Sequence, residues 1–146
     1  SAVYSTAPWG GVAQQDFLNA AIVAEDAAFG PDDWLRFGRE CEAAAERVRL
    51  ERWGPRSLDV DVVSCDAGDG EVLSDDPELT LPHPRAHQRA FVLVPWLDVE
   101  PDAVLTAEGE TRRIDDWLDG LEAAERDGVH RTDLNLTGTG VGGQAR

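Results

Sequence analysis

The chain has 146 residues, of which 42% are hydrophobic and 29% charged, proportions typical of one soluble globular domain with a buried core. Its 29 acidic residues outnumber 13 basic ones, and the resulting net charge of -16 disfavours nucleic-acid and anionic membrane partners. Every basic residue is arginine. The absence of lysine excludes P-loop, protein-kinase and Schiff-base mechanisms that need one.

The rest of the composition predicts a cytoplasmic protein. No apolar run approaches the roughly 20 residues that span a bilayer, and the first residues lack the features of a signal peptide. Cys41 and Cys65 have no metal-ligand spacing and are expected to be reduced and partly buried. The chain contains no methionine, which indicates that it begins after processing or inside a longer reading frame.

The first half of the chain predicts two strands and a helix. Residues 2–4 form a short strand leading into a turn, and residues 17–24 are a mostly apolar run of strand length. Gly30-Pro31-Asp32-Asp33 is typical of a helix start, because proline suits the first turn and acids its dipole. Apolar residues then recur at intervals of three and four, which predicts one helix face formed by Trp34, Phe37, Cys41, Ala44 and Val48. Arg52-Trp53-Gly54-Pro55 is expected to break this helix.

The second half predicts the clearest strand, at residues 57–63, where apolar and acidic residues alternate. Residues 66–78 are expected to form a hairpin or loop. Helices are expected at 85–97, in spite of Pro95, and near 114–121. We therefore predict one α+β sandwich domain over residues 1–131, followed by a flexible, glycine-rich tail over 132–146.

Asp59 and Asp61 are candidate metal ligands. On a strand, residues two apart point to the same face, so the two carboxylates would project together. They repel each other unless a cation lies between them, and hard oxygen ligands suit magnesium with nucleotide phosphates completing its shell. The alternative is an ordinary solvated strand face.

Arginines gather before this strand, and a histidine follows it. Arginine forks match phosphate oxygens, and Trp53 offers a ring for stacking. The dipole at a helix C-terminus explains Arg47 and Arg49 without a ligand, but not Arg52 and Arg56. Leu81-Pro82-His83-Pro84-Arg85, followed by Arg89, can hold the far end of a triphosphate, although a capping or packing role for His83 is the alternative.

In this order, the motifs resemble the 6-hydroxymethyl-7,8-dihydropterin pyrophosphokinase family. The strongest match is residues 52–61, Arg-Trp-Gly-Pro-Arg-Ser-Leu-Asp-Val-Asp, which resemble the family signature R-W-G-P-R-x-L-D-[LV]-D. Residues 4–10, 15–20, 81–84 and 89–93 match further family segments in order, so the similarity runs from Ser1 to about Pro101.

The resemblance implies a ferredoxin-like α/β sandwich and a role for each matching residue. Asp59 and Asp61 would hold two magnesium ions and act in catalysis with three arginines on a mobile loop and its flanks, Arg47, Arg49 and Arg56. The residues implied for ATP are Glu42, Arg47, Arg56, His83 and Arg89. Those implied for the pterin are Thr6, Trp9, Phe17, Asn19, Trp53 and Phe91, in which Asn19 pairs with the pterin edge and the rings of Trp53 and Phe91 cover its face.

The activity implied is transfer of pyrophosphate from ATP to the pterin hydroxymethyl group in folate biosynthesis, with AMP leaving. Family members begin with a strand carrying Gly-Ser-Asn-Leu-Gly and a helix, before the segment that starts here at Ser1. The resemblance therefore implies a domain truncated at its N-terminus by about 30 residues. The lost strand would have paired with the strand of Asp59 and Asp61, so we expect weakened folding, and an inactive or binding-only fragment is the alternative.

Other protein classes fit parts of the pattern. A sugar-nucleotide transferase also uses Asp-x-Asp, but does not call for the Trp-Gly-Pro-Arg loop. A degenerate module would bind pterin and nucleotide without forming AMP. A purely structural acidic domain would be indifferent to loss of Asp59 and Asp61.

Overall fold

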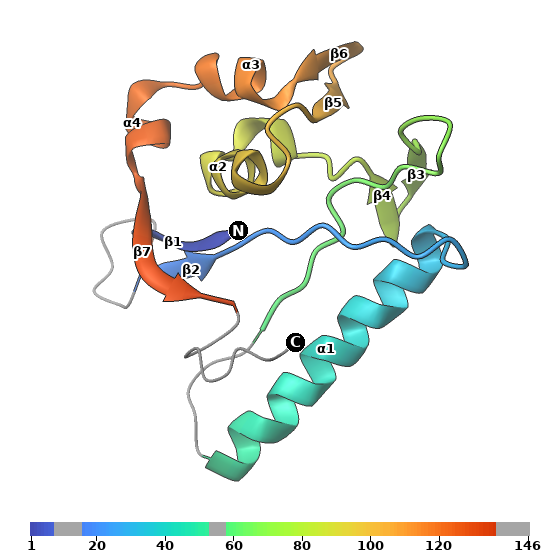
Figure 1. The fold of residues 1–146 in the computed structure, drawn as a ribbon, viewed down its shortest axis with the longest axis vertical. Coiled ribbons are helices and arrows are strands. Elements are labelled where there is room, and N and C mark those ends of the chain that lie inside the picture. Colours follow the sequence, from blue (N-terminus) through green and yellow to red (C-terminus); the bar gives the residue numbers. More distant parts are fainter. Residues whose placement is uncertain (8–15, 53–57, 137–146) are drawn as a thin grey trace. The chain divides into compact units, whose positions relative to one another are not determined.

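The computed structural model describes residues 1–7, 16–52 and 58–136, with side chains left undescribed at 49–52. The chain divides into two units, one formed by Ser1–Ala24 with Arg85–Arg146 and the other by Glu25–Pro84. Each unit combines helix with antiparallel strands, which confirms the α+β class (Figure 1). Within the described residues, no helix is long and apolar enough to cross a membrane.

The first unit is built on a three-stranded antiparallel sheet in the order β2-β1-β7. Its strands are β1 (Ala2–Thr6), β2 (Phe17–Asn19) and β7 (Val129–Asn135). The strand predicted over residues 17–24 is therefore shorter in the structure and ends at Asn19. β7 extends over Thr132 to Asn135, which the sequence assigns to the start of the tail, and residues 137–146 lie outside the described part of the chain.

The expected helix at 85–97 is two helical segments, η2 (Ala86–Gln88) and α2 (Ala90–Val99). Arg89 separates them because its backbone is extended, with φ -117° and ψ 106°. Pro95 is buried inside α2, as are Ala90, Leu93 and Trp96. The other buried apolar residues of the first unit include Val3 and Tyr4 of the central strand, together with Leu105, Ile114 and Trp117.

α2 is hydrogen-bonded to other segments of the first unit near both of its ends. Near its C-terminus, Asp98 accepts a hydrogen bond from the Ala2 N–H at 2.9 Å. At its N-terminus, the Ala90 N–H donates to Glu125 of α4 (Ala123–Asp127) at 3.0 Å. α4 leads directly into β7, whose first residue, Val129, lies opposite Thr6. α2 therefore runs antiparallel to β1, with its N-terminus at the Thr6 end.

Asp98→Asn is expected to lower the free energy of unfolding by about 1 kcal/mol at pH 7, because the carboxylate also lies 3.6 Å from Arg131 of β7. The Ala2 N–H is the main cause that lowers the pKa of Asp98 below 3.8. A folded-state pKa below the unfolded one adds stability that is complete above pH 3.8 and is lost as the pH falls through the lowered value. Urea unfolding should therefore show the two proteins converging as the pH falls below 3.8, and a difference that stays constant with pH would contradict this assignment.

A second hairpin of the first unit was not predicted from the sequence. β5 (Val104–Ala107) and β6 (Glu110–Arg113) are joined at Glu108 and Gly109, whose φ angles are both positive, 53° and 78°. Such angles match the right-handed twist of a two-residue hairpin turn. α3 (Ile114–Asp119) follows within the predicted range 114–121, and it buries Ile114 and Trp117.

The second unit contains α1 (Pro31–Arg52), which begins at the predicted proline. Asp33 reinforces this start by accepting the Gly30 N–H at 2.8 Å. The helix ends at Arg52, where the sequence predicted a break. A hairpin of β3 (Ser74–Asp76) and β4 (Leu79–Leu81) falls partly within the acidic stretch 66–78, as expected.

The predicted strand at 57–63 is wrong for the part that the structure describes. Residues 58–65 have no strand assignment, although Val63 accepts the His83 N–H and Cys65 the Val72 N–H, each at 2.8 Å. A strand requires a continuous ladder with a neighbour, and no described segment provides one along these residues. Alternation of side chains predicts an extended backbone but cannot provide the partner.

Candidate active site

In the second unit, α1 holds the segment that carries Asp59 and Asp61. Gly38 of α1 is buried against Val60, so closely that a β-carbon at Gly38 would lie 3.0 Å from Val60 Cγ1. One helical turn further, Glu42 Oε2 accepts the Val60 N–H at 2.7 Å. Packing and a charge-assisted hydrogen bond thus hold the residue between the two carboxylates.

Asp59 and Asp61 are both exposed, whereas Val60 packs on the helix. Val60 contacts α1 while its two neighbours are exposed, so both carboxylates are open to solvent and to a ligand. The described residues contain no group of three or more His, Cys, Asp or Glu side chains placed to hold a metal. An exposed pair of carboxylates nevertheless fits magnesium, which commonly binds through one or two protein carboxylates and takes its other ligands from phosphate and water.

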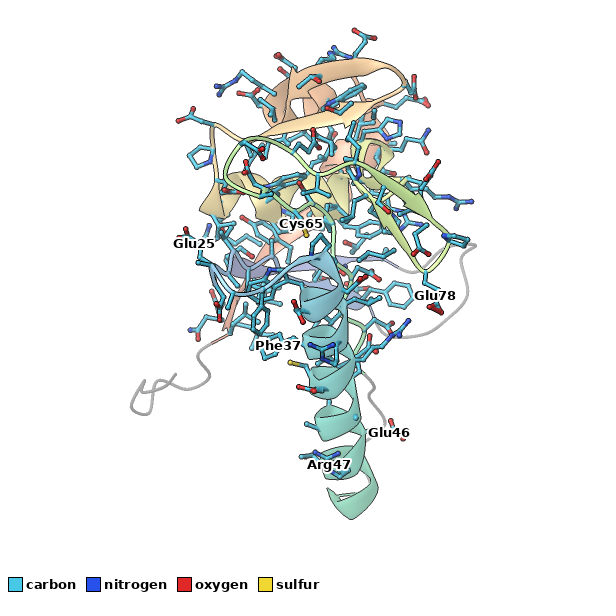
Figure 2. The ribbon with its side chains drawn as sticks, turned by 90° about the vertical axis from the view of Figure 1, so that its right-hand side faces the viewer. Glu25, Phe37, Glu46, Arg47, Cys65 and Glu78 are labelled. Atoms are coloured by element: carbon cyan, nitrogen blue, oxygen red, sulfur yellow. The ribbon has the colours of Figure 1, made fainter. Side chains whose placement is uncertain are left out.

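The structure places the other candidate residues of this unit around the same segment or on α1. The His83 backbone is hydrogen-bonded to Val63, two residues beyond Asp61, and its side chain is half-buried. Arg47 is exposed on the C-terminal part of α1 (Figure 2), and Arg49 follows in the same helix; the resemblance implies a mobile loop and its flanks for these arginines and Arg56. A run of alanines and long charged residues at 42–52 favours helix. Trp53 and Arg56 lie outside the described residues.

In the first unit, the register of β1 and β2 brings three candidate pterin residues to one face. Thr6 lies opposite Phe17, and Tyr4 lies opposite Asn19. Because residues two apart share a face of a strand, these four side chains lie on the same side of the sheet. That side faces α2, since Arg131, which lies opposite Tyr4 in β7, is 3.6 Å from Asp98 of α2. Burial, followed by the nearby Asp98 charge, raises the pKa of Tyr4.

Arg89 and Phe91 lie at the end of α2 that is near Thr6. The Arg89 guanidinium stands 5.4 Å from the centre of the Phe91 ring, within range of a cation–π interaction. The Thr6 hydroxyl is buried and has no hydrogen-bond partner in the described structure. Phe17 is 52% exposed, although it is a large apolar ring. An orphaned hydroxyl beside an uncovered aromatic ring is suited to a planar ligand with polar edges. Trp9 lies outside the described residues.

Sequence reasoning missed the residues that support these side chains. Gly38 in the middle of α1 is a signal that was available, since glycine weakens a helix and is often kept for close packing. Glu42 was assigned to ATP, whereas in the structure its carboxylate holds the Val60 backbone. Tyr4 and Asp98 gave no sequence signal, because their pairing joins residues far apart in the chain.

Comparison with known proteins agrees with this arrangement. The sequence profile of 7,8-dihydro-6-hydroxymethylpterin-pyrophosphokinase (HPPK) matches residues 1–101. The 2-amino-4-hydroxy-6-hydroxymethyldihydropteridine pyrophosphokinase of Mycobacterium leprae is 50% identical over 142 residues, covering 93% of this chain and 74% of that protein. The protein of the same name from Mycobacterium tuberculosis is 49% identical over 134 residues, covering 88% of this chain and 71% of its own length.

A more distant relative of the same name, from Methylorubrum extorquens, is 43% identical over 133 residues, which are 91% of this chain and 77% of that protein. The matches span both units, including the segments on which the resemblance was based. The chain therefore belongs to the 7,8-dihydro-6-hydroxymethylpterin-pyrophosphokinase family.

Proposed function

We propose that this chain transfers the pyrophosphoryl group of ATP to the hydroxymethyl oxygen of 6-hydroxymethyl-7,8-dihydropterin, giving AMP and the pterin diphosphate for folate biosynthesis. The observation that carries the proposal is the exposed carboxylate pair, Asp59 and Asp61, held from behind by α1 through Val60. Two neighbouring carboxylates repel each other unless a cation lies between them, and magnesium commonly binds through one or two carboxylates together with nucleotide phosphates.

Most of the residues proposed to bind the pterin belong to the first unit. Asn19 can both donate to and accept from the pterin edge, and the Thr6 hydroxyl lacks a partner that a ligand can provide. Phe17 and Phe91 offer aromatic faces for the bicyclic ring. Trp9 and Trp53 complete the proposed pterin residues on the strength of the family resemblance alone.

ATP and two magnesium ions are assigned to Asp59, Asp61 and the cationic residues. Bound magnesium would neutralise phosphate charge and polarise the phosphorus that is attacked. Glu42 supports the ligand segment through the Val60 N–H, and His83 is hydrogen-bonded close to that segment. The arginines proposed to bind the phosphates are Arg47, Arg49, Arg56 and Arg89.

The proposed reaction is an in-line displacement. The hydroxymethyl oxygen forms a bond to the β-phosphorus and releases its proton to solvent. The bond between the β-phosphorus and the oxygen that bridges it to the α-phosphorus breaks, and AMP leaves with that oxygen. The chain's own task is to hold both substrates and to stabilise charge with arginine forks, which needs no lysine. We also propose a cytoplasmic location and a ferredoxin-like arrangement, the second of which agrees with the mixture of helices and antiparallel strands.

The direct test is AMP formation from ATP and 6-hydroxymethyl-7,8-dihydropterin with magnesium, using the chain as it stands. We expect AMP to appear only when the pterin is present and to stop when EDTA removes the metal. Binding of pterin and of an unreactive ATP analogue, measured by calorimetry, separates the outcomes. Binding without AMP formation would overturn the proposed catalysis in favour of a binding-only module.

A further inference from the structure

His87 is the buried polar residue that the proposed reaction leaves without a role. It is 8% exposed, and apart from Tyr4 it is the buried polar side chain of the described residues. It lies in η2, immediately before Arg89 and α2. A buried imidazole needs a hydrogen-bond partner, so its contacts show what it holds.

Two contacts of the His87 side chain come from the β5–β6 hairpin and α3. His87 Nε2 lies 2.9 Å from Glu108 Oε2 at the hairpin turn. The imidazole ring meets Trp117 edge-to-face, with 5.2 Å between ring centres. Trp117 is itself fixed, because its N–H donates to the Leu105 carbonyl at 2.8 Å and the Arg112 guanidinium lies 4.5 Å from its ring centre. His87 therefore packs against a side chain, Trp117, whose own position is fixed.

Glu108 occupies its position at a conformational cost. Its φ of 53° lies in the left-handed region, which Asn and Gly adopt far more readily than Glu. The turn by itself would favour Asn-Gly over Glu-Gly. The side chain that stands there instead is long enough to reach His87.

The position of Arg89 depends on η2, because Arg89 is the single residue between η2 and α2. The Arg89 N–H donates to the Ala86 carbonyl at 3.2 Å, while its own carbonyl accepts from Val92 and Leu93 at the start of α2. Arg89 then covers the Phe91 ring. A change in the orientation of η2 thus moves the guanidinium proposed to bind ATP, together with its aromatic support.

We propose that the His87–Glu108 pair is a positioning device that locks η2 onto the β5–β6 hairpin and so orients Arg89 for the ATP phosphates. This inference rests on the proposed function for its kinetic consequence, but its structural part does not. His87 and Glu108 are positioning residues, and neither is assigned a contact with substrate.

The test compares Glu108→Asn with Glu108→Gln. Asn is favoured in the turn but is too short to reach His87, whereas Gln keeps both the reach and an acceptor oxygen. We expect Glu108→Asn to raise the KM for ATP roughly tenfold at an unchanged or higher melting temperature. Glu108→Gln should stay within about twofold of the parent. Glu110→Asn, an exposed position in the same hairpin, is the matched control and should leave the KM unchanged.

A second readout needs no turnover. In the unliganded protein, Glu108→Asn should shift the NMR signals of the Arg89 amide and the Phe91 ring, and Glu108→Gln should not. Unshifted signals in Glu108→Asn, or shifted signals with an unchanged KM in an active parent, would each overturn the proposal. If the parent makes no AMP but the signals shift, the proposed function fails while the structural lock is supported.

Discussion

Asp61→Ala is expected to lower pterin-dependent AMP formation by about 100- to 1,000-fold, a loss typical of removing one preorganised group that stabilises charge in the transition state. Stability should change by less than about 0.5 kcal/mol, because the Asp61 side chain is exposed and its removal relieves repulsion from Asp59. Initial rates of AMP release, measured with saturating magnesium and at equal folded concentration, provide the comparison.

Asp75→Ala is the matched control for this prediction. Asp75 is also an exposed carboxylate, in β3 of the same unit, and it is not among the candidate site residues. Its replacement changes the net charge by the same amount and should leave the rate within about twofold. If Asp61→Ala loses no more activity than Asp75→Ala, the carboxylate pair is a solvated surface and the metal assignment is wrong.

Gly38→Val is expected to destabilise the chain by about 1–3 kcal/mol and to reduce AMP formation. An added β-carbon at Gly38 would meet Val60 Cγ1 at 3.0 Å and Val60 Cβ at 3.4 Å. Relief of that overlap pushes residue 60 away from α1, lengthens the 2.7 Å hydrogen bond to Glu42 and displaces the carboxylates on either side. Valine in a helix is slightly preferred to glycine, so backbone propensity cannot explain a loss of stability.

A double-mutant cycle with Val60→Ala isolates this contact. Val60→Ala removes both methyl groups, including the one that the new side chain would strike, so the double mutant should be more stable than the sum of the two single changes predicts. Denaturant unfolding of the four proteins measures the coupling energy. Strict additivity would show that Gly38 and Val60 do not pack together as described.

Local signals were sufficient for several elements. Proline followed by two acids predicted the start of α1, and its apolar spacing predicted that the helix would continue to Arg52. The short first strand and α3 were predicted for similar reasons. The strand at 57–63 failed because alternation reports only an extended backbone, whereas a strand also requires a neighbour. The β5–β6 hairpin was missed because Glu-Gly is a weaker turn signal than Asn-Gly.

The sequence by itself determined the family, because ordered motifs such as Arg-Trp-Gly-Pro-Arg depend only on which residues occur and in what order. It also determined the chemistry available, namely arginine without lysine and a pair of carboxylates two residues apart. Only the tertiary structure decided which groups these residues meet. Glu42 reaches a backbone N–H 18 residues away, His87 an acid 21 residues away, and Ala2 a carboxylate 96 residues away. Such contacts depend on how distant segments pack, which no local propensity or spacing specifies.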